Sequence, residues 1–376
     1  MALESRNKLC STADCYNHSE EYNRLFVESM KEITAFHKEN NAFYAQWLEK
    51  EYFNIASLKT VDDCAHIPFV YADFFKTHVV KSVPDNQIVE HFTSSGTTGQ
   101  MSQMFFDERS IGDAVRMVDF EIAARGFVTP DQPSNYILYS YDIPEDSKLG
   151  TANTDKRLTK YSPVNEIEYA LKQDGFGGYE FDIFGVMEAF KRYAKQDLPV
   201  RILGFPSFFY FTLERMKRLG LKPLKLNPKS LALFGGGWKG YAGKQISKAE
   251  LYALGEEILG IPEERFCDGY GSVEHCIPYM ECTKHHFHVP TWSRVFIHDM
   301  KTLEVLPCGK PGFIHFVSPY ITSAPAHSVL MGDMAVLHPA SECGCGTNTP
   351  WFEILGRAGT SKNKSCAIAA SELLKR

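Results

Sequence analysis

The chain has 376 residues, of which 44% are hydrophobic and ten are cysteines, and its formal net charge is -6. This length allows one large domain or two ordinary ones, and the acidic balance argues against nucleic acid as the main partner. Residues 1–20 are polar and lack the pattern of a signal peptide, and no apolar run approaches the roughly 18 residues of a membrane span. The scattered cysteines favour reduced thiols and a cytoplasmic location.

The N-terminal third is predicted to contain helices, an extended connector and a pair of strands. Apolar residues at helical spacing indicate the helices, and alternation of apolar and polar residues indicates the strands. The predicted elements are helices over residues 21–37 and from there to about residue 53, a connector over 67–76, strands over 88–92 and 102–106, and a helix over 107–125.

The middle of the chain alternates strands and helices. This alternation predicts an α/β fold with a mostly parallel sheet, which binds its ligands at the carboxyl ends of the strands. Beyond Cys276 the chain changes to short strands with Pro and Gly turns, so an irregular, β-rich C-terminal third is expected. The predicted elements are strands over 201–205, 230–234 and 265–268 and helices over 207–219 and from 247 onward, the last with Ser247 and Glu250 at capping-box spacing.

A loop rich in hydroxyl and glycine residues follows the predicted strand 88–92. Because glycines allow close approach of the backbone, successive N–H groups and hydroxyls can converge there on the phosphates of a nucleotide. The Lys-Ser/Thr ending of a Walker A loop is absent, which argues against an ordinary P-loop fold; a polar surface turn is the alternative. The candidate phosphate-binding residues are Ser94, Ser95, Gly96, Thr97, Thr98 and Gly99.

Further candidate ligand groups come later in the chain. Three glycines after the strand 230–234 leave the backbone bare for a flat ring, although a tight turn would also need them. An aromatic after the strand 265–268 could stack on a purine, and the carboxylate that follows it could hold Mg²⁺, although an isolated Glu is usually solvated. A Gly-Asp and a Gly-Arg pair could bind a ribose or a phosphate. The candidates are Gly235, Gly236, Gly237, Tyr270, Glu274, Asp333 and Arg357.

The order and rough spacing of these motifs resemble the acyl-adenylate-forming enzymes, and among them the acyl-protein synthetases of the LuxE type. The resemblance implies an α/β fold, the large domain of that superfamily, with the small C-terminal domain absent because the chain ends about twenty residues past Gly356. It also implies a helical segment over 1–80, an adenylate-forming core over 81–355, and a hinge and tail over 356–376. It rests on residues 67 to the C-terminus, through the segments 92–97, 102–103, 235–239, 273–274, 288–292 and 366–367.

In the LuxE type a Cys near the C-terminus takes the acyl group from the adenylate, and Cys366 lies at the matching place. From the residues alone, the neighbouring Lys362 and Lys364 would favour its thiolate, while a small hydrophobe on a terminal helix is the alternative. The catalytic lysines usual in the superfamily are missing, and Lys364 is the candidate replacement. Position 273 is Val where Thr or Ser is usual.

Cysteine and histidine residues in the C-terminal third form a candidate metal site. Cys282 and His288 are six residues apart, and Cys343 and Cys345 form a Cys-x-Cys loop downstream. Three thiolates and one imidazole make a closed, tetrahedral zinc set of the structural type. His285 or His286 could replace His288, and a group of reduced thiols is the alternative.

The resemblance implies a two-step ligase that uses ATP and Mg²⁺. A carboxylic acid, expected to be a long-chain fatty acid, would become an acyl-adenylate, pass to Cys366 as a thioester, and be delivered to an acyl reductase partner. One alternative is a free-standing adenylating enzyme that loads an external thiol, such as a carrier protein or a CoA-like acceptor. Another is a non-catalytic subunit that binds a nucleotide or an acyl ligand.

Overall fold

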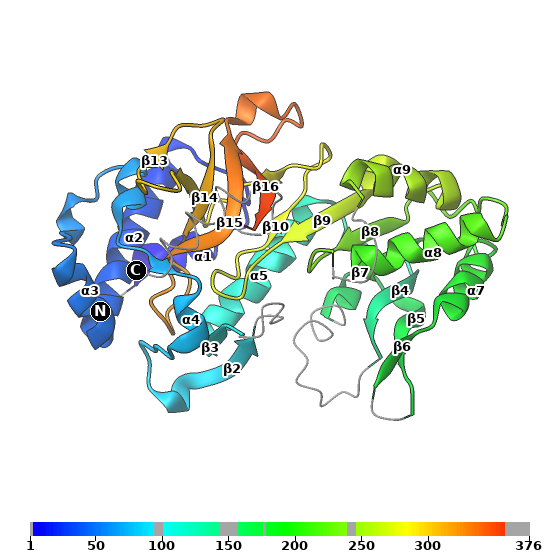
Figure 1. The fold of residues 1–376 in the computed structure, drawn as a ribbon, viewed down its shortest axis with the longest axis horizontal. Helices are drawn as coiled ribbons and strands as arrows, with labels where there is room; N and C mark the ends of the chain where they lie inside the picture. The colour runs from blue at the N-terminus through cyan, green and yellow to red at the C-terminus, as the bar shows by residue number, and fades with distance from the viewer. Residues whose placement is uncertain (1–2, 94–100, 143–156, 176–177, 239–245, 358–376) are drawn as a thin grey trace. The chain divides into compact units, whose positions relative to one another are not determined.

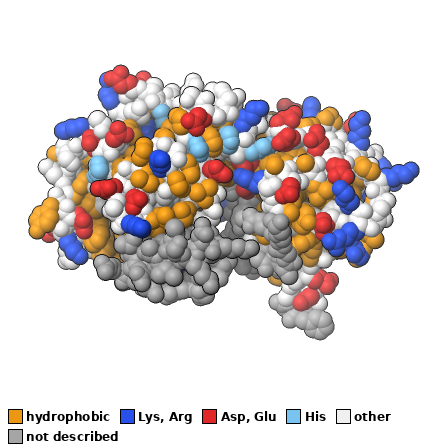
Figure 2. Space-filling model, turned by 45° about the horizontal axis from the view of Figure 1, so that its top comes forward, with side chains coloured by type: hydrophobic (Ala, Val, Ile, Leu, Met, Phe, Trp, Pro, Cys, Tyr) orange, Lys and Arg blue, Asp and Glu red, His pale blue; other side chains and the backbone are white. Residues whose placement is uncertain are grey.

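The computed structural model describes residues 3–93, 101–142, 157–175, 178–238 and 246–357. The chain divides into two compact units. The first unit comprises Met1–Ala124, Gly271–Tyr279 and His286–Arg376, and the second comprises Arg125–Tyr270 and Met280–His285. Among the described residues, no helix combines the length and the hydropathy needed to cross a membrane. Acidic and basic side chains are mixed across the face shown in Figure 2.

The first unit contains the N-terminal helices and a sheet that is antiparallel except for one pair of strands (Figure 1). The strand order is β11-β16-β15-β14-β12-β13, and β1 pairs with β15 in parallel. The strands are β1 (Val70–Tyr71), β11 (Phe287–His288), β12 (Arg294–His298), β13 (Val305–Leu306), β14 (Pro311–Val317), β15 (Ser328–His338) and β16 (Trp351–Arg357). The helices are α1 (Glu4–Cys10), α2 (Glu20–Asn40), α3 (Ala42–Lys50), α4 (Phe74–Thr77) and α5 (Glu108–Ala124), and a separate hairpin joins β2 (Ile88–Thr93) to β3 (Gln103–Asp107).

The second unit is a mainly parallel sheet with helices packed on it (Figure 1). The strand order is β10-β9-β8-β7-β4-β5-β6, and the pair β5–β6 is antiparallel. The strands are β4 (Ser134–Tyr141), β5 (Val164–Gln173), β6 (Tyr179–Phe181), β7 (Val200–Gly204), β8 (Leu231–Phe234), β9 (Phe266–Tyr270) and β10 (Tyr279–Met280). The helices are α7 (Ile183–Tyr193), α8 (Pro206–Arg218) and α9 (Lys248–Leu259).

The central strand β4 shows why the second unit needs cover on both faces of its sheet. Ile137 and Tyr139 belong to the large core cluster that α7, α8 and α9 complete. The alternate residues Tyr136 and Leu138 belong to a smaller cluster with Leu203 on β7. Because successive strand residues point to opposite faces, this continuous apolar run is buried on both sides, as parallel strands require.

Most of the predicted elements are confirmed, with bounds that shift by a few residues. The strands predicted over 201–205, 230–234 and 265–268 are β7, β8 and β9, and α9 begins after Ser247 with both hydrogen bonds of a capping box. The predicted extended connector over 67–76 is wrong in part, because α4 forms there beside the short strand β1. The β-rich C-terminal third is confirmed, and it forms a regular antiparallel sheet rather than an irregular region.

The core of the first unit contains an unusual number of histidines. His37 stacks on His327 with ring centroids 4.9 Å apart. The Tyr44 hydroxyl oxygen lies 2.8 Å from Nε2 of His327. A second pair of histidines is His298 and His315, whose Nε2 and Nδ1 atoms lie 3.0 Å apart. Burial lowers the pKa of each of these four imidazoles, for His37 to about 3. These rings are therefore neutral core residues at neutral pH.

Candidate functional site

In the second unit, the predicted glycine turn and Tyr270 leave the sheet next to each other. The parallel strands β8 and β9 pair with Phe234 opposite Asp268, so the turn that follows β8 lies at the same edge as the end of β9. Gly236 and Gly237 have φ angles of 75° and 66°, a backbone conformation that residues with a Cβ rarely adopt. Both glycines are exposed. The turn thus places bare backbone at the edge of the sheet where β9 ends with Tyr270.

The buried carboxylate of Glu281 stabilises this edge of the sheet through hydrogen bonds. Glu281 is 1% exposed and accepts hydrogen bonds from the Tyr252 hydroxyl and the Asp268 backbone N–H, both over 2.8 Å. Lys248, the first residue of α9, forms an ion pair with the same carboxylate. Burial and the charge of Glu281 raise the pKa of Asp268. Sequence reasoning missed this network; the only local signal was a Lys at the start of a capped helix.

Removal of the Glu281 carboxylate is expected to destabilise the second unit. In Glu281→Ala the buried Tyr252 hydroxyl and Asp268 N–H lose their acceptor, so the free energy of unfolding should fall by about 3 kcal/mol. Urea unfolding measures this change. The matched control is Glu257→Ala, which removes an exposed Glu–Lys pair with Lys217 and should change little. Equal midpoints for the two variants would contradict the structural role of Glu281.

In the first unit, the side chain of Glu274 has no hydrogen-bond or ion-pair partner among the residues that the structure describes. It lies in a turn in which the backbone N–H groups of His275 and Cys276 donate to the Ser272 carbonyl. Glu274 is 6% exposed, yet its carboxylate makes no hydrogen bond or ion pair to any other described residue. Oxygen donors of this kind are the ligands that Mg²⁺ prefers, and the role of Glu274 as a magnesium ligand stays a prediction.

The predicted ribose-binding pair is brought together by the antiparallel register of β15 and β16. Asp333 on β15 stands directly opposite Arg357 on β16, and Arg357 Nε lies 3.4 Å from Asp333 Oδ1. The Asp333 side chain is 14% exposed and that of Arg357 is 56% exposed. Ser272, in the turn that carries Glu274, contacts Met331 near the same part of β15. The Asp333 carboxylate, the Arg357 guanidinium and the Glu274 carboxylate thus lie in one unit.

Eight of the predicted site residues lie outside the described residues. These are the six residues of the phosphate-loop candidate, Ser94–Gly99, together with Lys364 and Cys366. The structure does describe the strands on either side of the loop. Both strands were predicted, and the structure shows that they pair with each other, from Thr93 opposite Gln103 to Ile88 opposite Asp107.

The four predicted metal ligands form one group. The ligand atoms of Cys282, His288, Cys343 and Cys345 all lie within 4.8 Å of one another. His288 Nε2 lies 3.1 Å from Cys343 Sγ and 3.2 Å from Cys345 Sγ. Nδ1 of His288 donates to the Thr349 carbonyl over 2.7 Å, which leaves the Nε2 lone pair facing the thiols, as in a metal-ligating imidazole.

The two histidines considered as replacements for His288 have other neighbours. His285 Nδ1 lies 3.4 Å from the Glu281 carboxylate, and its ring packs on Tyr252. His286 stacks on Trp351 with ring centroids 3.7 Å apart, although its Nδ1 also lies 3.1 Å from Cys343 Sγ. The structure therefore favours His288 as the imidazole of the group.

Two named enzymes and a solved structure are similar to this chain. The long-chain-fatty-acid–luciferin-component ligase of Vibrio harveyi is 24% identical over 357 residues, covering 94% of this chain and 89% of that protein. The enzyme of the same name from Aliivibrio fischeri is 21% identical over 365 residues, covering 95% and 90%. A crystal structure of 2-hydroxyisobutyryl-CoA ligase with 2-HIB-AMP and CoA aligns with a TM-score of 0.64 at 14% identity, covering 92% of this chain and 72% of that one.

The structural likeness confirms the predicted α/β fold, which this chain shares with that ligase over 92% of its length. The family model described as "Acyl-protein synthetase, LuxE" matches residues 3–375, almost the whole chain. The resemblance predicted from the motifs is therefore confirmed. The chain belongs to the LuxE family of acyl-protein synthetases, and it is a ligase of the acid–thiol class.

Proposed function

We propose that this protein activates a long-chain fatty acid with ATP and then carries the acyl group on its own Cys366. The observation that carries the first step is the Glu274 carboxylate, which has no partner among the described residues and lies in the same unit as the Asp333–Arg357 pair. The names of the Vibrio harveyi and Aliivibrio fischeri relatives support a long-chain fatty acid as the substrate.

In the activation step, a carboxylate oxygen of the fatty acid attacks the α-phosphorus of ATP, and pyrophosphate leaves. Glu274 would hold Mg²⁺, which neutralises charge on the phosphates. Asp333 can accept both ribose hydroxyls, and Arg357 can donate to the ribose or a phosphate. The Gly235–Gly237 turn and Tyr270 would bind the adenine ring, and Ser94–Gly99 the β and γ phosphates.

In the transfer step, the Cys366 thiolate attacks the carbonyl carbon of the acyl-adenylate. The C–S bond forms, the C–O bond to the phosphate breaks, and AMP leaves with the electron pair of that bond. Lys364 would favour the thiolate by its positive charge. The thioester would then pass its acyl group to an acyl reductase partner.

Covalent labelling tests the proposal. The purified protein with Mg·ATP and an alkyne-bearing fatty acid is expected to show a label on a denaturing gel that neutral hydroxylamine removes. The label should require ATP and be lost in Cys366→Ser, while Cys308→Ser, which removes an exposed thiol, should retain it. Fatty-acid-dependent pyrophosphate release without a label would instead indicate an external thiol acceptor. Absence of both signals would indicate a non-catalytic binding subunit.

We also propose that Cys282, His288, Cys343 and Cys345 bind a structural zinc ion. The distances among their ligand atoms and the donor set of three thiols and one imidazole fit a closed tetrahedral site. About one equivalent of zinc per chain is expected in the purified protein. Cys343→Ser should lose it and unfold at lower temperature, and Cys308→Ser is the control. A zinc content below about half an equivalent would contradict this site.

A further inference from the structure

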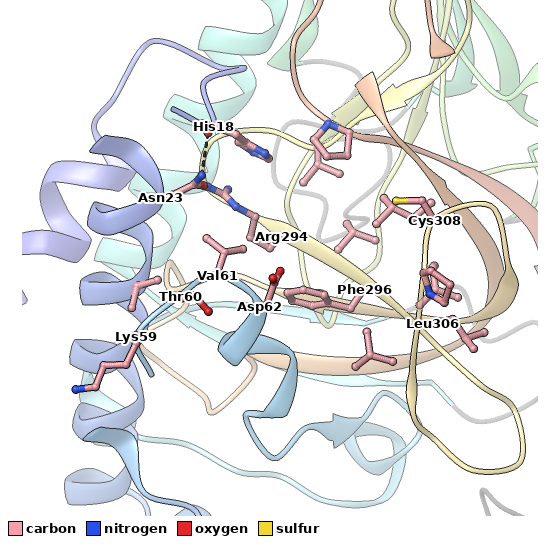
Figure 3. Close-up of a pocket in the computed structure, with 18 of the residues that line it drawn as sticks. His18, Asn23, Lys59, Thr60, Val61, Asp62, Arg294, Phe296, Leu306 and Cys308 are labelled. Carbon is pink, nitrogen blue, oxygen red and sulfur yellow. Dashed lines mark hydrogen bonds between the residues drawn. The ribbon is translucent and has the colours of Figure 1, made fainter. Parts of the chain in front are cut away.

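A cavity of about 790 Å³ lies within the first unit, lined by residues of α2, the loop before residue 62, β12 and β13 (Figure 3). Its size falls within the usual range of small-molecule sites. The apolar part of the cavity wall includes Val27, Val61, Phe296 and Leu306. None of the residues assigned above to the nucleotide, the magnesium ion or the zinc ion lines it. The lining of the cavity therefore shares no residue with the proposed adenylation and zinc sites.

A buried cation also lines this cavity. Arg294 is 4% exposed. Among the described residues, its guanidinium donates only to neutral oxygens: the Thr291 and Ser293 carbonyls and Asn23 Oδ1, the last over 2.7 Å. It also lies over the Phe26 ring, 4.3 Å from the centroid.

No acidic group compensates this charge among the described residues. Arg294 forms no ion pair with a described carboxylate, and its Nε–H is buried without a hydrogen-bond partner there. Burial lowers the pKa of Arg294 to about 9, which reflects the cost of the uncompensated charge. An anion brought to this guanidinium would relieve that cost and satisfy the remaining donor.

The other charged side chains of the cavity lie at its rim. Glu20 and Arg24 are exposed and pair with each other over 2.9 Å. Lys59 and Asp62 are also exposed, and in Figure 3 the Lys59 ammonium points away from Arg294. These rim charges have both signs and are screened by water, so the buried guanidinium decides which ligand is favoured. The apolar walls would remain wet beside a small inorganic anion, whereas a hydrocarbon chain would cover them.

We propose that this cavity is a second, non-catalytic binding site for a long-chain fatty carboxylate, with the carboxylate at Arg294 and the hydrocarbon chain along Val27, Val61, Phe296 and Leu306. Such a site would hold free fatty acid on the protein independently of ATP. It goes beyond the proposed ligase reaction, and it does not require that reaction to occur.

Photolabelling of the full chain without ATP tests this site. The probe is a palmitic acid analogue that carries a diazirine and an alkyne, and labelled peptides are located by mass spectrometry. Saturable labelling is expected on the peptides that contain Val61 and Phe296. The matching fatty alcohol probe, which lacks the carboxylate, should label these peptides at least about tenfold less efficiently, the size expected for one charge-assisted hydrogen bond.

Three variants separate the charge from the cavity and from surface charge. Arg294→Met removes the guanidinium but keeps an apolar chain over Phe26, and Leu306→Trp fills the cavity from the half-buried edge strand while leaving Arg294 in place. Both should raise the half-saturating probe concentration at least about tenfold. Arg24→Gln is the matched control, because it removes an exposed arginine from the same cavity rim and should label like the wild type.

Melting temperatures show which variants are folded. If Arg294→Met does not fold, the labelling of Leu306→Trp decides whether the fatty carboxylate binds in this cavity. Labelling confined to other peptides, equal labelling by acid and alcohol, or unchanged labelling of a folded Leu306→Trp would each overturn the proposal. Because no ATP is present, a failure here leaves the Cys366 labelling result untouched, and a failed ligase assay leaves this one interpretable.

Discussion

Glu274→Gln is expected to lower fatty-acid-dependent pyrophosphate release at least about 100-fold, since the variant loses the charged oxygen that would hold the metal at the phosphates. The free energy of unfolding should change little, because the Glu274 carboxylate has no hydrogen-bond or ion-pair partner to lose among the described residues. Pyrophosphate release measured over a range of Mg²⁺ concentrations, together with urea unfolding, checks both parts.

The matched control for this variant is Glu353→Gln, which neutralises an exposed glutamate on β16 of the same unit. It should change neither quantity. A Glu274→Gln enzyme with wild-type release at the same Mg²⁺ concentration would show that Glu274 is not the metal ligand. A strong loss of stability would show that its carboxylate has a structural partner.

Acidification is expected to destabilise the protein well before its carboxylates titrate. Burial lowers the pKa of both His18 and His37 to about 3, whereas in the unfolded chain each has a pKa of about 6.5. Below pH 6.5 the unfolded state therefore binds more protons than the native state, so stability falls as the pH falls. Between pH 7.5 and 5.5 these two residues together should cost about 3 kcal/mol.

The buried His298, His315 and His327 have lowered pKa values for the same reason and should add to this loss. Urea unfolding at pH 7.5, 6.5 and 5.5 gives the free energy of unfolding at each pH. The slope of this free energy against pH gives the number of protons taken up on unfolding. His37→Gln, which keeps a side chain that can hydrogen-bond to Ser82 and the Ile321 carbonyl, should reduce the uptake by about one proton. A flat stability profile over this range would mean that these rings are already protonated or hydrated in the native state.

Elements whose signals are local could be predicted from the sequence. Ser247 and Glu250 specify the start of α9 by their own side-chain hydrogen bonds, and apolar periodicity located α2, α5 and α8. The strands β4 and β5 and the helix α7 were not predicted. Their apolar runs are buried on two faces or interrupted by polar residues, so neither the helical nor the strand period is clear.

The order of the motifs was enough to indicate the family, because each motif is a short segment whose residue types are set by the ligand that it would contact. Asp333 and Arg357 were predicted as separate groups with the same ligand. Only the antiparallel register of β15 and β16 made them direct neighbours. Likewise, the sequence left three histidines open for the zinc group, and the hydrogen bond from His288 to Thr349 distinguishes one of them.

By itself, the sequence determined the family, the alternation of strands and helices in the middle of the chain, and the residue types of the adenylation and metal sites. Only the tertiary structure decided that Glu281 supports the end of β9, that Glu274 has no partner among the described residues, and that Arg294 is a buried cation on a cavity wall. The reason is physical: burial and pairing depend on contacts between residues far apart in the chain, and residue type and local spacing do not encode those contacts.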